Sequence, residues 1–229
     1  MAVSDSFCRF FDCITSSFYG YSQRNGSWII RENDPSASLT ELSVNRTTSD
    51  FIGFNHNLTK SMPNLTCNRS TKCKDKECDG IAFVNSGANE GLLFVELKSK
   101  YDTSPVSTAV EQMCFSFLKM HAMLSLCSGY VLSNMEISFC VATKCAVTEN
   151  EEAKINQFID KALKNEDQKR LGSFFRDLFI KGCVSIKLEE LFNVKCINLP
   201  LHEDIKNKLI NVHLVTTLKP NDTKAIFNY

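Results

Sequence analysis

The sequence has no apolar run that approaches the roughly 18–20 residues needed to span a bilayer. Its N-terminal stretch, MAVSDSFCRFFDCITSSF, is interrupted by charged side chains at Asp5, Arg9 and Asp12. A secretory signal peptide requires a continuous apolar segment. The sequence therefore predicts a cytoplasmic protein without a membrane span or a signal peptide.

The sequence also lacks an excess of charge of either sign. Its 26 Lys and Arg residues balance 26 Asp and Glu residues, so the net charge is zero. This excludes a strongly basic protein that binds nucleic acid through overall charge, although a local basic groove is compatible with it. Hydrophobic residues at 43% and charged residues at 23% are typical of a folded chain. We expect one domain over residues 1–229.

Several common catalytic patterns are missing. The sequence contains no glycine-rich phosphate loop and no Ser/His/Asp or Cys/His arrangement in a recognisable context. Its histidines, at positions 56, 121, 202 and 213, share no metal-binding spacing. The 11 cysteines are an odd number, spread over the whole chain. Without a secretory signal, this favours reduced thiols over a disulfide framework.

The clearest structural pattern begins at Asp79. Residues 79–84 and 91–98 are apolar runs separated by a loop that contains Gly and Asn, which predicts a β-hairpin. The run over residues 92–95 is continuously apolar and indicates a central strand buried on both faces. Before this hairpin, residues 1–48 predict one or two helical stretches around a short strand at 27–30, and residues 56–77 predict a long loop or a small lobe.

A long helix is expected after the hairpin. Ser104 and Pro105 predict an N-cap followed by proline at the first helical position. An apolar stripe at steps of three and four continues the helix through Val106, Val110, Met113, Phe117, Met120, Leu124 and Cys127. The alternation over residues 137–141 then predicts another strand.

The C-terminal part predicts further helices and short strands. Thr148 and Glu151 form a capping-box pattern at the start of one helix, and a second helix over residues 171–178 is expected to end at Gly182. Short strands are expected over 183–188, 195–199 and 212–218, around a helix near Ile205. The element order predicts an α/β fold with a mixed central sheet flanked by helices.

The hairpin brings charged residues together. If Val84 pairs with Gly91 in a symmetric hairpin, Asp79 lies opposite Glu96 on the same face of the sheet. Lys98 shares this face because it is two residues beyond Glu96. Adjacent carboxylates repel unless a cation lies between them, and oxygen ligands favour Mg²⁺ or Mn²⁺. With a nearby ammonium group, this set is suited to metal-assisted hydrolysis of a phosphodiester.

Asp79-Gly80 followed by Val95-Glu96-Leu97-Lys98 resembles the signature of the PD-(D/E)xK nuclease superfamily, which has a restriction-endonuclease-like fold. The resemblance covers a core of about residues 38–143, with residues 144–229 as a C-terminal elaboration. It implies that Asp79 and Glu96 are metal ligands, that the Leu97 carbonyl is a further ligand, and that Lys98 lies beside the attacking water. Cys78 stands where the family often has proline.

Two further site residues are implied by the same resemblance. Gln112 lies on the helix after Lys98, where some members of the superfamily carry a glutamine. Glu41, in the stretch from Ser38 to Ser43, corresponds to an acidic residue on the family's first helix. The resemblance implies a magnesium-dependent nuclease that acts on DNA in preference to RNA, with family habits pointing to microbial defence or restriction.

Two alternatives stay open. The hairpin could be a surface element in which Glu96 and Lys98 are ordinary neighbours. The chain could also be a catalytically silent subunit of the same fold, because its zero net charge and its lack of a DNA-reading segment favour dependence on a protein partner. Some of the phenylalanines at positions 158, 174, 175 and 179 could form a homodimer or partner interface instead of core.

A second group of residues is Cys67, Cys73 and Cys78, interleaved with lysines. Three thiolates could hold a structural Zn²⁺ with His56 or a distant cysteine as the fourth ligand. The C-x5-C-x4-C spacing lacks the close ligand pair that is typical of such sites. We therefore expect three reduced cysteines in a loop, without zinc.

Overall fold

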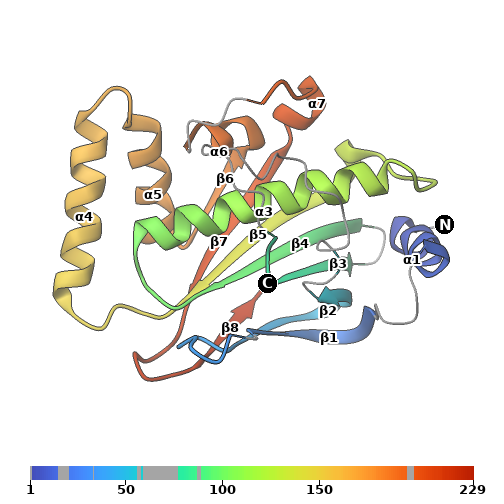
Figure 1. Ribbon diagram of the computed structural model, residues 1–229, viewed down its shortest axis with the longest axis horizontal. Coiled ribbons are helices and arrows are strands. Elements are labelled where there is room, and N and C mark those ends of the chain that lie inside the picture. The colour runs from blue at the N-terminus through green and yellow to red at the C-terminus, as the bar shows by residue number, and fades with distance from the viewer. Residues whose placement is uncertain are drawn as a thin grey trace.

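A computed structural model describes residues 2–14, 21–32, 34–55, 58, 77–86, 89–194 and 199–229. In these ranges one mixed sheet of eight strands has the order β1-β2-β3-β4-β5-β7-β6, with β8 paired to β2 (Figure 1). The strands are β1 (Tyr21–Arg31), β2 (Glu41–Asn55), β3 (Gly80–Ser86), β4 (Asn89–Lys98), β5 (Glu136–Thr143), β6 (Cys183–Lys187), β7 (Leu209–Thr216) and β8 (Lys224–Asn228). The helices are α1 (Val3–Ile14), α3 (Thr103–Leu124), the 3-10 turn η1 (Leu132–Asn134), α4 (Glu149–Lys164), α5 (Lys169–Lys181), α6 (Leu188–Val194) and α7 (Glu203–Lys206).

The sheet changes from antiparallel to parallel at its centre. Strands β1 to β4 form an antiparallel meander, whereas β5 runs parallel to β4 and β7 parallel to β5. At the edges of this arrangement, β6 is antiparallel to β7 and β8 is parallel to β2. The predicted α/β class with a mixed, helix-flanked sheet is confirmed.

The predicted hairpin register is also confirmed. Val84 pairs with Gly91 and Gly80 pairs with Val95 in the β3–β4 ladder. Strand β4 lies between β3 and β5 and is buried from Gly91 to Leu97. The continuous apolar run in β4 is thus explained by cover on both of its faces.

Helix α3 covers one face of the sheet along its length (Figure 1). Phe94 of β4 makes edge-to-face contacts with Phe117 of α3 and with Phe139 of β5. The predicted stripe on α3 is buried from Val106 to Leu124. The N-cap is Asp102 instead of Ser104, because the Asp102 side chain accepts a hydrogen bond from the Ser104 amide.

The opposite face is covered by the bent hairpin of β1 and β2. Trp28 pairs with Val44, yet its indole ring lies over Gly53 and Gly80, so β2 bends between its two halves. A Cβ atom on Gly53 would lie 2.2 Å from Nε1 of Trp28, which leaves room only for glycine. A second apolar core forms here from Trp28, Ile30, Leu39, Leu42, Val44, Phe51, Ala82, Val84, Leu93, Val95, Leu97, Cys140, Ala142, Ala225 and Phe227.

The N-terminal expectation is partly wrong. Helix α1 and strand β1 account for one predicted helix and for the strand at 27–30, but residues 41–55 form β2. Leu42 and Val44 are buried, whereas Glu41 and Ser43 are partly exposed. Burial that alternates with every second residue is typical of a strand. Glu41 therefore begins a strand and does not lie on a helix.

The C-terminal expectations are mostly confirmed. Strand β6 and helix α5, which is followed by Gly182 in the left-handed conformation at φ 74°, occur where predicted, as does α7 near Ile205. The Thr148 side chain makes no cap bond, and Glu151 instead accepts from the Val147 amide. Strand β7 begins earlier than expected, and β8 was not anticipated. Residues 195–198, within a predicted strand, lie outside the described residues.

No helix in the described part of the chain is long and apolar enough to cross a membrane.

Candidate active site

Asp79 and Glu96 interlock at the open end of the β3–β4 hairpin. The amide of Asp79 donates to Oε2 of Glu96 at 3.1 Å, and the amide of Leu97 donates to Oδ2 of Asp79 at 2.7 Å. The structure therefore brings the two carboxylates together, as the register predicted. It also places the main chain of Leu97 beside Asp79.

Lys98 completes this cluster. Its ammonium group contacts Oε1 of Glu96 and donates to Oε1 of Gln112 at 2.8 Å. The Glu96 side chain is 3% exposed and that of Lys98 is 20% exposed, so the ammonium group connects a buried carboxylate to the surface. Four of the predicted site residues, Asp79, Glu96, Lys98 and Gln112, are thus linked by direct contacts.

A polar row on α3 holds the segment that precedes Asp79. The Gln112 amide donates to the Glu77 carbonyl at 3.0 Å, and the Ser116 hydroxyl accepts from the Cys78 amide at 3.0 Å. One turn further, Nζ of Lys119 lies 3.1 Å from Oε1 of Glu77. Because these residues occupy positions i, i+4 and i+7, they face the same side of the helix.

Burial is the main influence on the electrostatics of Asp79 and Glu96. Burial is the main cause that raises the pKa of Asp79 to about 6 and the pKa of Glu96 to about 8. The charge of Asp79 raises the pKa of Glu96 further, and the Lys98 ammonium offsets part of the effect. The site therefore favours either a proton or a cation between its carboxylates.

Glu32 is an acidic neighbour of this site that sequence patterns did not indicate. Trp28 and Ile30 both reach the Cβ position of Gly80, next to Asp79. Glu32 directly follows β1 and continues the alternation of Trp28 and Ile30, whose side chains lie on one face of the strand. The charge of Glu32 contributes to raising the pKa of Asp79. Only the bend of the β1–β2 hairpin brings it there.

Glu41 does not join the cluster through any contact described. Its carboxylate lies 3.1 Å from Nε of Arg31 and 3.1 Å from Nζ of Lys224, which come from the neighbouring strands β1 and β8. The hydrogen bond from Lys224 is the main cause that lowers the pKa of Glu41. The expectation that Glu41 lies on a helix is wrong, and in the structure Glu41 fastens three strands together.

Asp79 and Glu96 are the residues that could hold a hydrated divalent ion. Within the described ranges, no group of three or more His, Cys, Asp or Glu side chains converges on one metal position. Mg²⁺ in proteins typically keeps several waters and is held by one or two carboxylates. Asp79 and Glu96 could supply these carboxylates, and a cation would offset the charge of Asp79 that helps burial to raise the pKa of Glu96.

The cysteine group is only partly described. Cys67, Cys73 and His56 lie outside the described residues. Cys78 is buried, with Sγ donating to the Gly80 carbonyl at 3.4 Å, and burial raises the pKa of its thiol. These contacts suit a structural thiol and disfavour a thiolate ligand at this position.

Some of the supporting residues had a sequence signal. Gln112, Ser116 and Lys119 recur at steps of four and three in a helix rich in apolar residues, a spacing that indicates a polar row facing one partner. No sequence pattern indicated that residues 77–78 would contact this row, or that Glu32 would lie near Asp79. Both contacts depend on long-range packing.

No protein-family model, no curated protein and no solved structure matches this chain. The function of the site is therefore inferred from the geometry of its own residues.

Proposed function

We propose that the chain is a metal-dependent nuclease that hydrolyses phosphodiester bonds in DNA. The observation that carries this proposal is the buried contact among Asp79, Glu96 and Lys98. A surface hairpin would leave such charged ends in water, whereas the Glu96 side chain is only 3% exposed. Two carboxylates and an ammonium group in one buried cluster suit phosphoryl chemistry.

The order of elements supports a restriction-endonuclease-like core. Helix α1 precedes the antiparallel strands β2, β3 and β4, after which α3 leads to β5, parallel to β4. With β1 set aside, this order resembles the family's helix, three strands, helix and strand, but its first helix is α1, which precedes the expected core of residues 38–143. Strand β1 and residues 144–229 are additions to that core.

In this proposal Asp79 and Glu96 would hold Mg²⁺ or Mn²⁺, with the Leu97 carbonyl as a further ligand. The bound ion would supply Lewis acidity and lower the pKa of a water molecule. Lys98 would hold the attacking water or stabilise charge that develops on the phosphate. Gln112, bonded to both Lys98 and the Glu77 carbonyl, would keep the ammonium group in place.

A second candidate function is a catalytically silent subunit that binds a protein partner. It is favoured by the internal hydrogen bonds of the carboxylates, because Asp79 bonds to the Leu97 amide and Glu96 bonds to the Asp79 amide. Such bonds could simply fasten β3 to β4. The two functions differ in whether the purified chain cleaves DNA.

The test is cleavage of supercoiled and single-stranded DNA with Mg²⁺, and with a chelator as the blank. Lys98→Ala should reduce the rate about a hundredfold or more, since contacts made in the transition state are typically worth about 3–4 kcal/mol. Lys98→Arg should rescue poorly, because the guanidinium group is planar and does not release its proton.

Lys161→Ala is the matched control, since this exposed lysine lies on α4, away from the cluster. Thermal melts must show that all variants are folded. Equal rates for wild type and Lys98→Ala would reject the catalytic role of Lys98. Absence of Mg²⁺-dependent cleavage of any DNA by the wild type would favour the silent subunit.

A further inference from the structure

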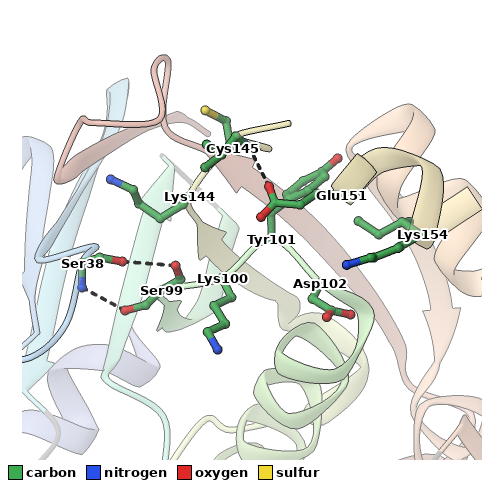
Figure 2. A pocket seen from close by; sticks show the side chains of 11 residues that line it. Ser38, Ser99, Lys100, Tyr101, Asp102, Lys144, Cys145, Glu151 and Lys154 are labelled. Atoms are coloured by element: carbon green, nitrogen blue, oxygen red, sulfur yellow. Dashed lines mark hydrogen bonds between the residues drawn. The ribbon is translucent and has the colours of Figure 1, made fainter. Parts of the chain in front are cut away.

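A hollow of about 380 Å³ adjoins the candidate active site at the carboxyl ends of β4 and β5 (Figure 2). It begins one residue beyond Lys98, at Ser99, whose hydroxyl accepts a hydrogen bond from the Ser38 amide at 3.0 Å. The connection from β4 to α3, the chain after β5 and the first turns of α4 form its other walls. The proposed chemistry at Asp79 and Glu96 does not use this hollow.

Three lysines from separate segments line the hollow. Lys100 follows β4, Lys144 follows β5 and Lys154 lies on α4 (Figure 2). Lys144 is 9% exposed and donates to the Asp222 carbonyl. Lys100 and Lys154 are exposed, and neither forms an ion pair within the described part of the chain. The three ammonium groups point in different directions in Figure 2, but the exposed side chains of Lys100 and Lys154 can turn toward an anionic ligand in the hollow.

The acidic residues in the wall are engaged by helix starts. Asp102 accepts hydrogen bonds from the Ser104 amide and the Thr103 hydroxyl at the start of α3. Glu151 accepts from the Val147 amide at the start of α4. The helix N-termini partly offset these two negative charges. The negative charge that Asp102 and Glu151 add to the hollow is therefore reduced.

We propose that this hollow binds a backbone phosphate of the nucleic-acid strand, next to the phosphate that is hydrolysed at Lys98. This inference rests on the proposed function for the identity of the ligand. Lys100 is two residues beyond Lys98, just after the end of β4, so a nucleic-acid strand bound at Lys98 passes close to Lys100. Lys100 and Lys154 supply the charges that contact the phosphate, whereas the ammonium group of Lys144 is held by the Asp222 carbonyl. The contact carries no base specificity, because phosphates are the same at every position.

The test is binding of a fluorescently labelled single-stranded oligonucleotide, measured by anisotropy without divalent metal so that no cleavage occurs. The double variant Lys100→Ala/Lys154→Ala should weaken binding about tenfold at low salt. It should also make the plot of log K against log salt concentration shallower by about 0.7 for each phosphate that is no longer neutralised by a lysine.

The matched control is Lys161→Ala/Lys164→Ala, which removes the same charge from exposed positions on α4 outside the hollow. We expect this control to bind like the wild type. Equal weakening in both double variants would overturn the inference, because the effect would then be one of overall charge. Failure of the wild type to bind any oligonucleotide would also overturn it.

The outcomes separate this site from the proposed nuclease function. Binding that depends on Lys100 and Lys154, without Mg²⁺-dependent cleavage, would support the phosphate site and refute the nuclease. The opposite result is that the wild type cleaves DNA through Lys98 and that the Lys100→Ala/Lys154→Ala variant binds and cleaves DNA as well as the wild type does. This result would support the nuclease and refute the phosphate site.

Discussion

Lys119 and Glu77 form a buried ion pair across 42 residues of sequence, with Nζ and Oε1 3.1 Å apart. The Lys119 side chain is 1% exposed and that of Glu77 is 18% exposed. Since Glu77 is two residues before Asp79, this pair fixes the segment that delivers a carboxylate to the candidate active site. The position of Asp79 therefore depends on the ion pair between Lys119 of α3 and Glu77.

Glu77→Gln should lower the free energy of unfolding by about 3 kcal/mol, because it removes a carboxylate that pairs with the buried Lys119 ammonium. Urea unfolding measures this loss. The double variant Glu77→Gln/Lys119→Met should lose less than the sum of the single changes.

The exposed pair of Lys169 and Glu166, 3.4 Å apart, is the control for this cycle. Its coupling energy should be at most about 0.5 kcal/mol. Similar coupling energies for the two pairs would contradict the structural role of the buried one.

The raised pKa values of Asp79 and Glu96 predict stability that falls with rising pH. Their usual values are 3.8 and 4.5, and in the folded protein they are about 6 and about 8. Between these limits the folded state binds more protons than the unfolded state, so the free energy of unfolding decreases from about pH 4 to about pH 8. The slope is at most about 1.4 kcal/mol per pH unit for each proton.

Denaturant unfolding at several pH values, without divalent metal, measures this slope. Glu96→Gln should flatten the upper part of the profile, above about pH 6, since it removes the group that titrates there. An unchanged slope in Glu96→Gln would show that another group is responsible.

Metal binding should depend on the interlocked carboxylates. Calorimetry with Mg²⁺ or Mn²⁺ should detect binding that Asp79→Asn and Glu96→Gln each weaken at least tenfold, because each removes one of two anionic ligands. Glu41→Gln should bind the ion like the wild type, since Glu41 pairs with Arg31 and Lys224. Unchanged binding in both cluster variants would reject the site.

Glu32→Gln should lower the pKa of Asp79, because the negative charge of Glu32 raises it in the wild type. Carboxyl carbon chemical shifts followed by NMR through a pH titration measure this change. Asp50→Asn, an exposed change on β2, is a suitable control that should leave the Asp79 titration in place. A shift of equal size in both variants would argue against a specific effect of Glu32.

The sequence by itself determined the hairpin and the three charged residues it brings together. Side chains alternate with a period of two, and a symmetric loop between Val84 and Gly91 leaves one register, so Asp79 and Glu96 had to meet. The stripe on α3 was equally readable, because burial repeats every three or four residues along a single helix. These features depend on interactions between residues close in sequence.

Only the tertiary structure decided what surrounds that cluster. Residues 38–43 carry an ambiguous short pattern, and pairing with β1 and β8 made Glu41 part of a strand. The bend of β2 that places Trp28 over Gly53 brings Glu32 toward Asp79, and packing of α3 brings Lys119 to Glu77. Such contacts join segments far apart in the chain, and their free energy comes from burial and pairing that no local pattern encodes.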